Sequence, residues 1–204
     1  MDVDEPAAGS YDDVLTSAEK DAIGEISNIS LGSSATTLFT LVNQRVNIST
    51  PTVSVCRWED LSRQYNKPCV FIQISYKEGL DGKNILILQE RDVKIIADLM
   101  MGGDGSNVDG DLTEMHLSAI SEAMNQMMGS SSTSLSSMLE TKVDISPPDA
   151  SRVDLNTANA GNIAPFLQGE FVKVSFRMQI GSLVDSELMQ LYPIEFAQSL
   201  YRKF

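Results

Sequence analysis

Histidine and cysteine are scarce in this sequence, and their scarcity excludes several kinds of catalytic and structural site. Among 204 residues there are one histidine, His116, and two cysteines, Cys56 and Cys69. One histidine cannot serve two Ser-His-Asp triads, and no cysteine and histidine cluster is present that would bind zinc. Both cysteines lie in apolar, strand-like stretches and no secretory signal is recognisable. We therefore expect two buried thiols rather than a disulfide.

The sequence also has no long hydrophobic run and no recognisable phosphate-binding loop, and its acidic residues outnumber its basic ones. No apolar run reaches the roughly 18 residues of a membrane-spanning helix, and no glycine-rich loop ends in Gly-Lys-Ser/Thr. The Gly- and Asp-rich segment 102–111 lacks the ligand spacing of a calcium loop, so we interpret it as a plain loop. There are 15 Lys and Arg against 28 Asp and Glu, a net charge of -13. This charge disfavours nucleic acid and anionic membranes as partners and favours proteins with basic patches.

What the sequence does contain is an internal repeat with an offset of 97 residues. DAIGEISN at residues 21–28 matches SAISEAMN at residues 118–125, and 13 of the 31 positions from 21 to 51 are identical in the second copy. The matched pairs include Glu25/Glu122, Asn28/Asn125, Gly32/Gly129, Ser33/Ser130, Val46/Val143 and Pro51/Pro148.

A duplication of this kind predicts one pseudo-symmetric domain with a shared core. We place repeat 1 at about residues 15–103 and repeat 2 at about residues 111–204. Residues 1–14 are acidic and poor in apolar side chains, a composition that cannot offset the entropy of ordering. We expect them to form a disordered tail.

Each repeat is predicted to begin with a long helix. Apolar periodicity follows Thr16 and Glu19, which have the spacing of a capping box, and predicts a helix over residues 16–42. Asp111 and Glu114 have the same form, and the second helix is expected to run to about residue 141. The middle of each helix carries small side chains, GSSA at 32–35 and GSSS at 129–132. We expect the two helices to pack near one another there.

Strands and shorter helices fill the rest of each repeat. The alternation over residues 45–58 predicts two short strand segments bent or broken at Pro51, followed by a polar loop to Lys67. In the second repeat a strand over 142–146 leads to Pro147 and Pro148. Further strands are predicted over 69–76, 84–89, 171–180 and 186–191, helices over 91–101 and 193–203, and irregular chain over 149–169.

Each repeated helix carries one polar stripe. Asp21, Glu25 and Asn28 stand at i, i+4 and i+7, so they share a face, while Ile23, Ile26 and Leu31 can face inward. The second copy of the stripe consists of Ser118, Glu122 and Asn125. The solvated face of an amphipathic helix would explain one copy, and a capping or bridging role for the asparagines remains a structural alternative. Retention of the same Glu and Asn while their neighbours diverged indicates a geometric requirement.

A Glu and an Asn on an exposed helix face support only a narrow chemistry. A carboxamide does not titrate, so it cannot act as a general base, and neither side chain offers a nucleophile in this setting. An asparagine can hold a water molecule, as a glutamine does for the attacking water in GTPases. The electrophile and its metal would then belong to a partner. His116 has no counterpart in the first repeat, and we interpret it as incidental.

The spacing (Asp/Ser)-x3-Glu-x2-Asn-x22-Pro, present twice, resembles the signature of the CheC/CheX/FliY response-regulator phosphatases of bacterial chemotaxis. The segments IIADLMMGGDG and SLVDSELMQLYP extend the resemblance, which is greatest to the central domain of the FliY branch and covers about residues 15–204. The resemblance implies an α+β fold in which two long antiparallel helices lie on a central, mainly antiparallel sheet. Each helix would present one site.

The resemblance also implies a substrate and a role for each site residue. The substrate would be the aspartyl phosphate of phosphorylated CheY, and the regulator would supply the Mg2+. Asn28 and Asn125 would orient the hydrolytic water. Glu25 and Glu122 would pair with a lysine of the regulator. The remaining motif residues would support the stripe and the strand that follows it: Asp21, Ser118, Pro51 and Pro148.

By the same resemblance the protein would work in the cytoplasm, at the cytoplasmic face of the flagellar basal body, with motor switch (C-ring) proteins as partners. It would have no cofactor of its own. Two features of the FliY branch are not recognisable: an N-terminal regulator-docking segment in residues 1–14 and a C-terminal FliN-like domain. The alternative, from a different class, is a non-catalytic switch scaffold or CheY-binding module that uses the two stripes only for docking.

Overall fold

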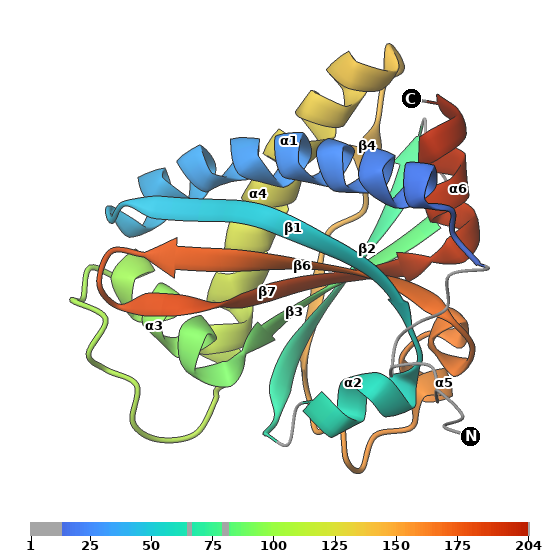
Figure 1. Cartoon of the computed structure of the whole chain (residues 1–204). Helices are drawn as coiled ribbons and strands as arrows, with labels where there is room; N and C mark the ends of the chain where they lie inside the picture. The colour runs from blue at the N-terminus through green and yellow to red at the C-terminus, as the bar shows by residue number, and fades with distance from the viewer. Residues whose placement is uncertain (1–13, 65–66, 79–81, 204) are drawn as a thin grey trace, which may run out of the picture.

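A curled antiparallel sheet with two long helices across one face forms the body of the molecule (Figure 1). The computed structural model describes residues 14–64, 67–78 and 82–203; the predicted tail lies outside them except for Val14. The long helices are α1 (Ser17–Val42) and α4 (Glu114–Leu139). The shorter helices are α2 (Trp58–Gln64), α3 (Glu90–Met100), α5 (Ala160–Ile163), α6 (Ile194–Lys203) and a 3-10 helix, η1 (Pro165–Gln168). The predicted α+β class is confirmed.

The strands of the described chain join in one seven-stranded sheet in which the two repeats exchange their first strands. Its order is β1-β6-β7-β3-β2-β4, with β5 also paired to β2, and every pairing is antiparallel. The strands are β1 (Val46–Cys56), β2 (Cys69–Glu78), β3 (Gly82–Gln89), β4 (Asp144–Ile145), β5 (Asp149–Val153), β6 (Phe171–Ile180) and β7 (Val184–Pro193).

The register of these strands follows a pseudo-twofold axis. Cys56 of β1 pairs with Phe171 of β6, and the equivalent Val153 of β5 pairs with Cys69 of β2. At the centre, Ile87 of β3 pairs with Met189 of β7, which are equivalent residues of the two repeats. A residue paired with its own equivalent marks the axis. The duplication read from the sequence is thus the symmetry of the fold.

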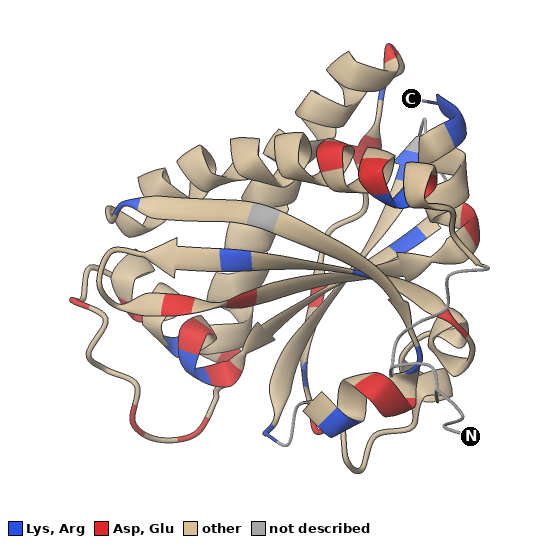
Figure 2. Cartoon of the chain, viewed as in Figure 1, with Lys and Arg blue, Asp and Glu red and all other residues tan. Residues whose placement is uncertain are grey.

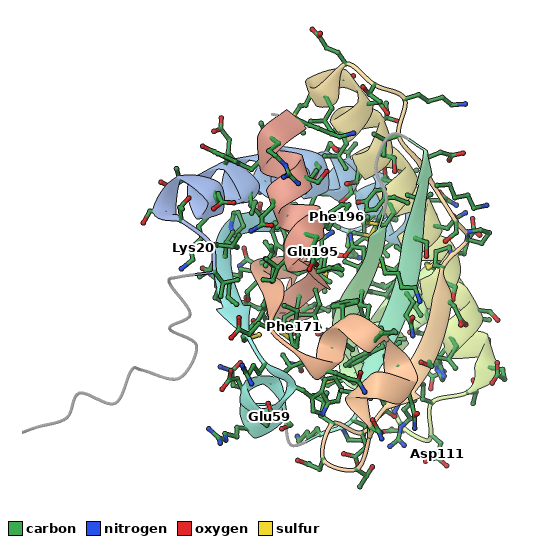
Figure 3. The ribbon with its side chains drawn as sticks, turned by 90° about the vertical axis from the view of Figure 1, so that its right-hand side faces the viewer. Lys20, Glu59, Asp111, Phe171, Glu195 and Phe196 are labelled. Atoms are coloured by element: carbon green, nitrogen blue, oxygen red, sulfur yellow. The ribbon has the colours of Figure 1, made fainter. Side chains whose placement is uncertain are left out.

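Alternate residues along the strands supply two hydrophobic cores, one on each face of the sheet. On the face covered by α1, α3, α4 and α6, strand residues such as Ile72 and Val174 pack against helix residues such as Ile26 and Met127. Phe196 of α6, labelled in Figure 3, is part of this core. Its ring stacks on Tyr76 and meets Tyr192 edge to face, with ring centroids 5.1 and 5.2 Å apart. The opposite face packs under α2, α5 and η1. Both long helices are therefore fixed by the larger core.

The long helices match each other residue for residue at the predicted offset. Each has 26 residues and ends at a residue in the left-handed conformation, Asn43 (φ 52°) and Glu140 (φ 50°). At the start of α1 the expected capping box is present: the Thr16 N–H donates to Glu19 Oε1 and the Glu19 N–H to Thr16 Oγ1, both 3.1 Å. These bonds satisfy two of the free N–H groups at the helix end.

The start of α4 differs from the prediction. Its N-cap is Thr113 rather than Asp111, and the Thr113 N–H donates to His116 Nδ1 at 2.9 Å. His116 therefore occupies the position that Glu19 has in α1, so the interpretation of this residue as incidental was wrong. The imidazole nitrogen accepts the same backbone hydrogen bond as the carboxylate does, which the repeat offset alone would have revealed.

Serine and threonine side chains, not the glycines, connect the two long helices. Ser134 Oγ donates to Ser33 Oγ at 2.8 Å, and the symmetry-equivalent pair Thr37 and Ser130 also shares a hydrogen bond. Higher residue numbers on α1 meet lower ones on α4, so the helices run in opposite senses at their contact. A Cβ added at Gly32 or Gly129 would meet nothing within 4 Å. The expected packing of the helix centres is confirmed, but the glycines face away from it.

Two segments hold more regular structure than the sequence predicted. The expected polar loop before Lys67 contains α2, whose Leu61 is buried and whose Asp60 accepts a hydrogen bond from the Arg57 N–H. The segment 149–169, expected to be irregular, holds β5, α5 and η1. Each of these elements is short, and each is stabilised by packing on the sheet rather than by a periodic pattern.

The other expected elements are present. The β2 and β3 strands pair antiparallel as predicted, while the hairpin turn itself lies outside the described residues. In segment 102–111, Asp98 Oδ2 accepts a hydrogen bond from the Gly105 N–H at 2.8 Å, which fixes the loop. Cys56 and Cys69 are buried free thiols, as expected, and burial raises their pKa to about 12 and about 11 respectively.

Candidate active site

The outward face of α1 presents Asp21, Glu25 and Asn28 together. All three are exposed, whereas Ile23 and Ile26 between them are buried in the core, as the helical spacing predicts. Near Gly24 the helix α1 lies against β1. A Cβ added at Gly24 would be in van der Waals contact with Val53 Cγ2, at 3.5 Å. Among the described residues, Glu25 and Asn28 have no side-chain hydrogen bond or ion pair. Both are free to bind a partner.

The outward face of α4 presents Ser118, Glu122 and Asn125 in the same arrangement, and all three are exposed. This site contains one interaction that α1 lacks: Gln126 Nε2 donates to Glu122 Oε1 at 2.7 Å. The equivalent residue on α1 is Ile29, which cannot form such a bond. Glu122 is thereby held by its own helix, while Glu25 is not. Sequence reasoning missed Gln126, although its i+4 spacing from Glu122 is a recognised signal.

The prolines of the motif lie where the strand after each long helix is bent or interrupted. In β1 the pairing with β6 shifts its register between Ser49 and Thr52, around Pro51. In the second repeat the strand is broken at Pro147 and Pro148, leaving β4 and β5 as separate pieces. Proline cannot donate a ladder hydrogen bond, so a bend or break at this position is expected. The predicted bend at Pro51 is confirmed, and the strand expected before Pro147 ends there; the continuation as β5 was not predicted.

The break after α4 opens a shallow hollow beside the second stripe. It has a volume of about 430 Å³, and its walls are the α4 stripe and the start of β5. Its lining residues are Glu114, Leu117, Ser118, Ser121, Glu122, Asn125, Pro147, Pro148, Asp149 and Ala150. The geometry therefore brings Ser118, Glu122, Asn125 and Pro148 to one place. Pro147, Asp149 and Ala150 belong to the same hollow and were not predicted.

The charges on the two long helices are mainly acidic. The N-terminal half of α1 carries three acidic residues, Glu19, Asp21 and Glu25, and one basic residue, Lys20, whereas its C-terminal half carries no charge (Figure 2). Within the described part of the chain, Asp21 and Ser118 make no side-chain hydrogen bond, so neither is required to hold its helix in place. Both remain available to a partner.

The described residues contain no group of three or more His, Cys, Asp or Glu side chains placed to hold a metal ion. Nor does any helix within them have the length and apolar character needed to cross a membrane.

Comparison with known proteins connects this arrangement to a family. Residues 19–55 and 115–152, which hold the two stripes and the strands that follow them, match the model of the CheC-like family. The flagellar motor switch phosphatase FliY of Bacillus subtilis (strain 168) is 49% identical over 198 residues, which are 97% of this chain and 52% of that protein. The chain thus spans about half the length of this curated relative.

Solved structures agree in fold. The crystal structure of Thermotoga maritima FliY has a TM-score of 0.86 and 38% identity, with 94% of this chain and 98% of that chain covered. The FliM middle domain from H. pylori has a TM-score of 0.69 at 14% identity, covering 93% of this chain and 100% of that chain; at that identity the likeness shows the fold alone. With a FliY structure matched over nearly its whole length and the duplicated motif in place, the chain belongs to the CheC-like family, with FliY proteins among its relatives.

Proposed function

We propose that this domain hydrolyses the aspartyl phosphate of a phosphorylated response regulator of the CheY type, at two separate sites. One observation carries the proposal: the same exposed Glu and Asn lie at equivalent positions of α1 and α4, in a fold related by a pseudo-twofold axis. A relative that is 49% identical is named a phosphatase. Support therefore comes from both the repeated geometry and the family.

Asn28 and Asn125 are proposed to position the attacking water. The carboxamide offers an oxygen that accepts a hydrogen bond and an N–H2 group that donates one, so it can hold a water in line with the phosphorus. As the water oxygen bonds to phosphorus, the bond between phosphorus and the aspartyl oxygen breaks. The products are inorganic phosphate and a free carboxylate. Such reactions depend mainly on positioning and electrostatic stabilisation, so an uncharged side chain suffices.

Glu25 and Glu122 are proposed to bind a lysine of the regulator. A carboxylate at i-3 from the asparagine lies on the same helix face, so one docked surface can engage both residues. The contact would fix the regulator relative to the water held by the asparagine. Asp21 beside Glu25 adds negative charge that attracts a basic surface, whereas Ser118 beside Glu122 does not.

The exposure of both stripes favours a protein as the substrate. Small molecules are usually bound in enclosed cavities that bury most of their surface. Here the reactive side chains stand on the outer face of a helix, and the hollow at α4 is formed only by that helix and a strand end. A partner protein must supply the other half of the site, and we propose that the Mg2+ comes with it.

We also propose that the domain acts at the flagellar motor switch, on the cytoplasmic face of the basal body. The curated relative is named for this assembly, and the fold is shared with FliM. The alternative, a non-catalytic scaffold or CheY-binding module, predicts binding to the regulator without release of phosphate.

The test is to charge CheY with acetyl phosphate in Mg2+, remove the excess, and measure phosphate release with and without this domain. Acceleration by the domain is expected, and EDTA should stop it without changing the circular dichroism of the domain. No hydrolysis of p-nitrophenyl phosphate is expected, because the chain alone offers only Glu and Asn. Binding of phosphorylated CheY with no acceleration would establish the scaffold alternative instead.

A further inference from the structure

Two large apolar side chains stand exposed on the same helix as the first site. Ile29 is 45% exposed and directly follows Asn28, and Phe39 is 47% exposed near the end of α1. Single exposed apolar residues are common and need no explanation. Two of them beside a candidate active site are more informative, because rigid apolar side chains are the usual anchors of protein interfaces.

Helix geometry places Phe39 in line with the site. Eleven residues separate it from Asn28, which is about three turns, so the two side chains differ by only about 20° around the axis. Along the axis they are about 16 Å apart. An interface of ordinary size covers about 800 Å² on each partner, a patch roughly 30 Å across. A protein docked over Asn28 can therefore also cover Phe39.

Gly32 lies between these residues on the same face. A Cβ there would meet nothing within 4 Å, so the packing of this chain does not require glycine. Glycine inside a helix lowers stability relative to alanine because it loses more backbone entropy on folding. The absence of a side chain leaves the helix backbone open to close approach from outside.

The equivalent positions of α4 are chemically different. Ile29 corresponds to Gln126, which is bonded to Glu122. Phe39 corresponds to Ser136, whose hydroxyl is engaged with the Ser132 carbonyl and the Val143 N–H. The α4 face does expose Met115, but this residue lies before Ser118 rather than beyond Asn125.

We propose that Ile29 and Phe39, with Gly32 between them, form an apolar docking patch for the receiver domain of the response regulator at the α1 site, and that the α4 site lacks this patch. The inference rests on the proposed function, because that function places the regulator over Asn28. Ile29 is exposed one turn beyond Glu25, at i+4, so a partner that engages both Glu25 and Asn28 also covers it. The α1 site should consequently have the lower KM.

The two sites are separated for the test by inactivating one at a time. Asn125→Ala leaves the α1 site, and Asn28→Ala leaves the α4 site. In the Asn125→Ala chain, Ile29→Gln installs the residue found on α4 and should raise KM for phosphorylated CheY about tenfold, with a smaller effect on kcat. Phe39→Ser should raise it several-fold. The same substitutions in the Asn28→Ala chain are the matched controls and should leave the α4 site unchanged.

Gly32→Ala separates docking from folding. Because the added methyl group meets nothing within this chain, the midpoint of thermal unfolding should rise. If a partner approaches the helix backbone at this point, KM of the α1 site should rise at the same time. A purely structural glycine would not give a more stable domain that binds its substrate less well.

Binding is measured independently by titrating beryllofluoride-activated CheY, which does not turn over. An Ile29→Gln chain that binds it as tightly as its parent would overturn the docking patch, even if both chains are active phosphatases. An absence of phosphate release from the parent chains, with binding still weakened by Ile29→Gln, would contradict the proposed function and leave the patch in place.

Discussion

The two repeats share the proposed site residues but not the surroundings of those side chains. At α1, Glu25 and Asn28 stand on a helix packed closely on β1, with Ile29 exposed beside them. At α4, Glu122 is bonded to Gln126 and faces a hollow that the break at Pro148 creates. What is identical in both copies is the helical arrangement on which the proposed chemistry rests. What differs is the set of side chains around each stripe that a docked partner would contact.

Substituting the glutamates should show a large difference between the two sites. Measured in the chain that retains only the α1 site, Glu25→Ala should reduce kcat/KM for phosphorylated CheY by about 10- to 100-fold, since it removes one member of a charge pair across the interface. Glu122→Ala in the chain that retains only the α4 site should cost less, because Glu122 must first leave Gln126. Equal losses at the two sites would contradict the role assigned to that hydrogen bond.

A second difference between the repeats lies in the core. Asp92 of α3 is 3% exposed and its Oδ2 has no hydrogen-bond partner among the described residues. Burial raises the pKa of Asp92 above its usual range, more than the Ser186 hydroxyl and Arg91 lower it. At the offset of 102 residues that relates Ile87 to Met189, the equivalent position of α6 is Ile194, an apolar side chain packed against the same core.

A raised pKa in the folded state means that folding opposes ionisation of Asp92. The penalty is absent below the pKa of the unfolded chain, about 3.9, and grows as the pH rises through the folded pKa. Asp92→Asn should therefore increase the free energy of unfolding at pH 7, by about 1 kcal/mol, the scale of an unpartnered buried polar atom. Urea titrations at pH 7 and pH 4 check this: the gain should shrink at pH 4, and a gain that is equal at both would contradict it.

The smallest expected effects concern the helix caps, where Glu19 and His116 hold equivalent positions. Thr16→Ala and Thr113→Ala should each lower the free energy of unfolding by about 1 kcal/mol, because each removes the hydroxyl that accepts the N–H of the third helical residue. His116→Ala should cost a similar amount or less, whereas His116→Glu should preserve the cap. If His116→Ala left stability unchanged in urea titrations, the capping role of this histidine would be refuted.

Much of this architecture could be predicted from the sequence because the duplication repeats the pattern of each main element. The long helices, the hairpin strands, the bend at Pro51 and the end of the strand before Pro147 all follow from local patterns that occur in both repeats. The short elements did not, since α2 and β5 are fixed by contacts with the sheet that no local pattern reports. The role of His116 was missed for a different reason. An imidazole and a carboxylate accept the same hydrogen bond, but a comparison of residue identities does not pair His116 with Glu19.

The candidate site was predictable as a set of positions but not as a surface. Helical spacing placed Glu25, Asn28, Glu122 and Asn125 on exposed stripes, and the structure agrees. The hydrogen bond of Gln126, the hollow at Pro148 and the exposure of Ile29 and Phe39 depend on tertiary packing. The roles of Asp21 and Ser118 stay predictions, since neither side chain is hydrogen-bonded within the described chain.

The most direct test of two separate catalytic sites is to compare dephosphorylation of CheY by four proteins: the parent chain, Asn28→Ala, Asn125→Ala and the double variant. Loss of one positioning group should slow its own site by about 10- to 1000-fold. The single variants should each stay active, with rates that add up to that of the parent, as expected for distant sites that share no partner. The double variant should remain folded and release phosphate no faster than CheY alone. Full activity in the double variant, or complete loss in either single variant, would contradict the account.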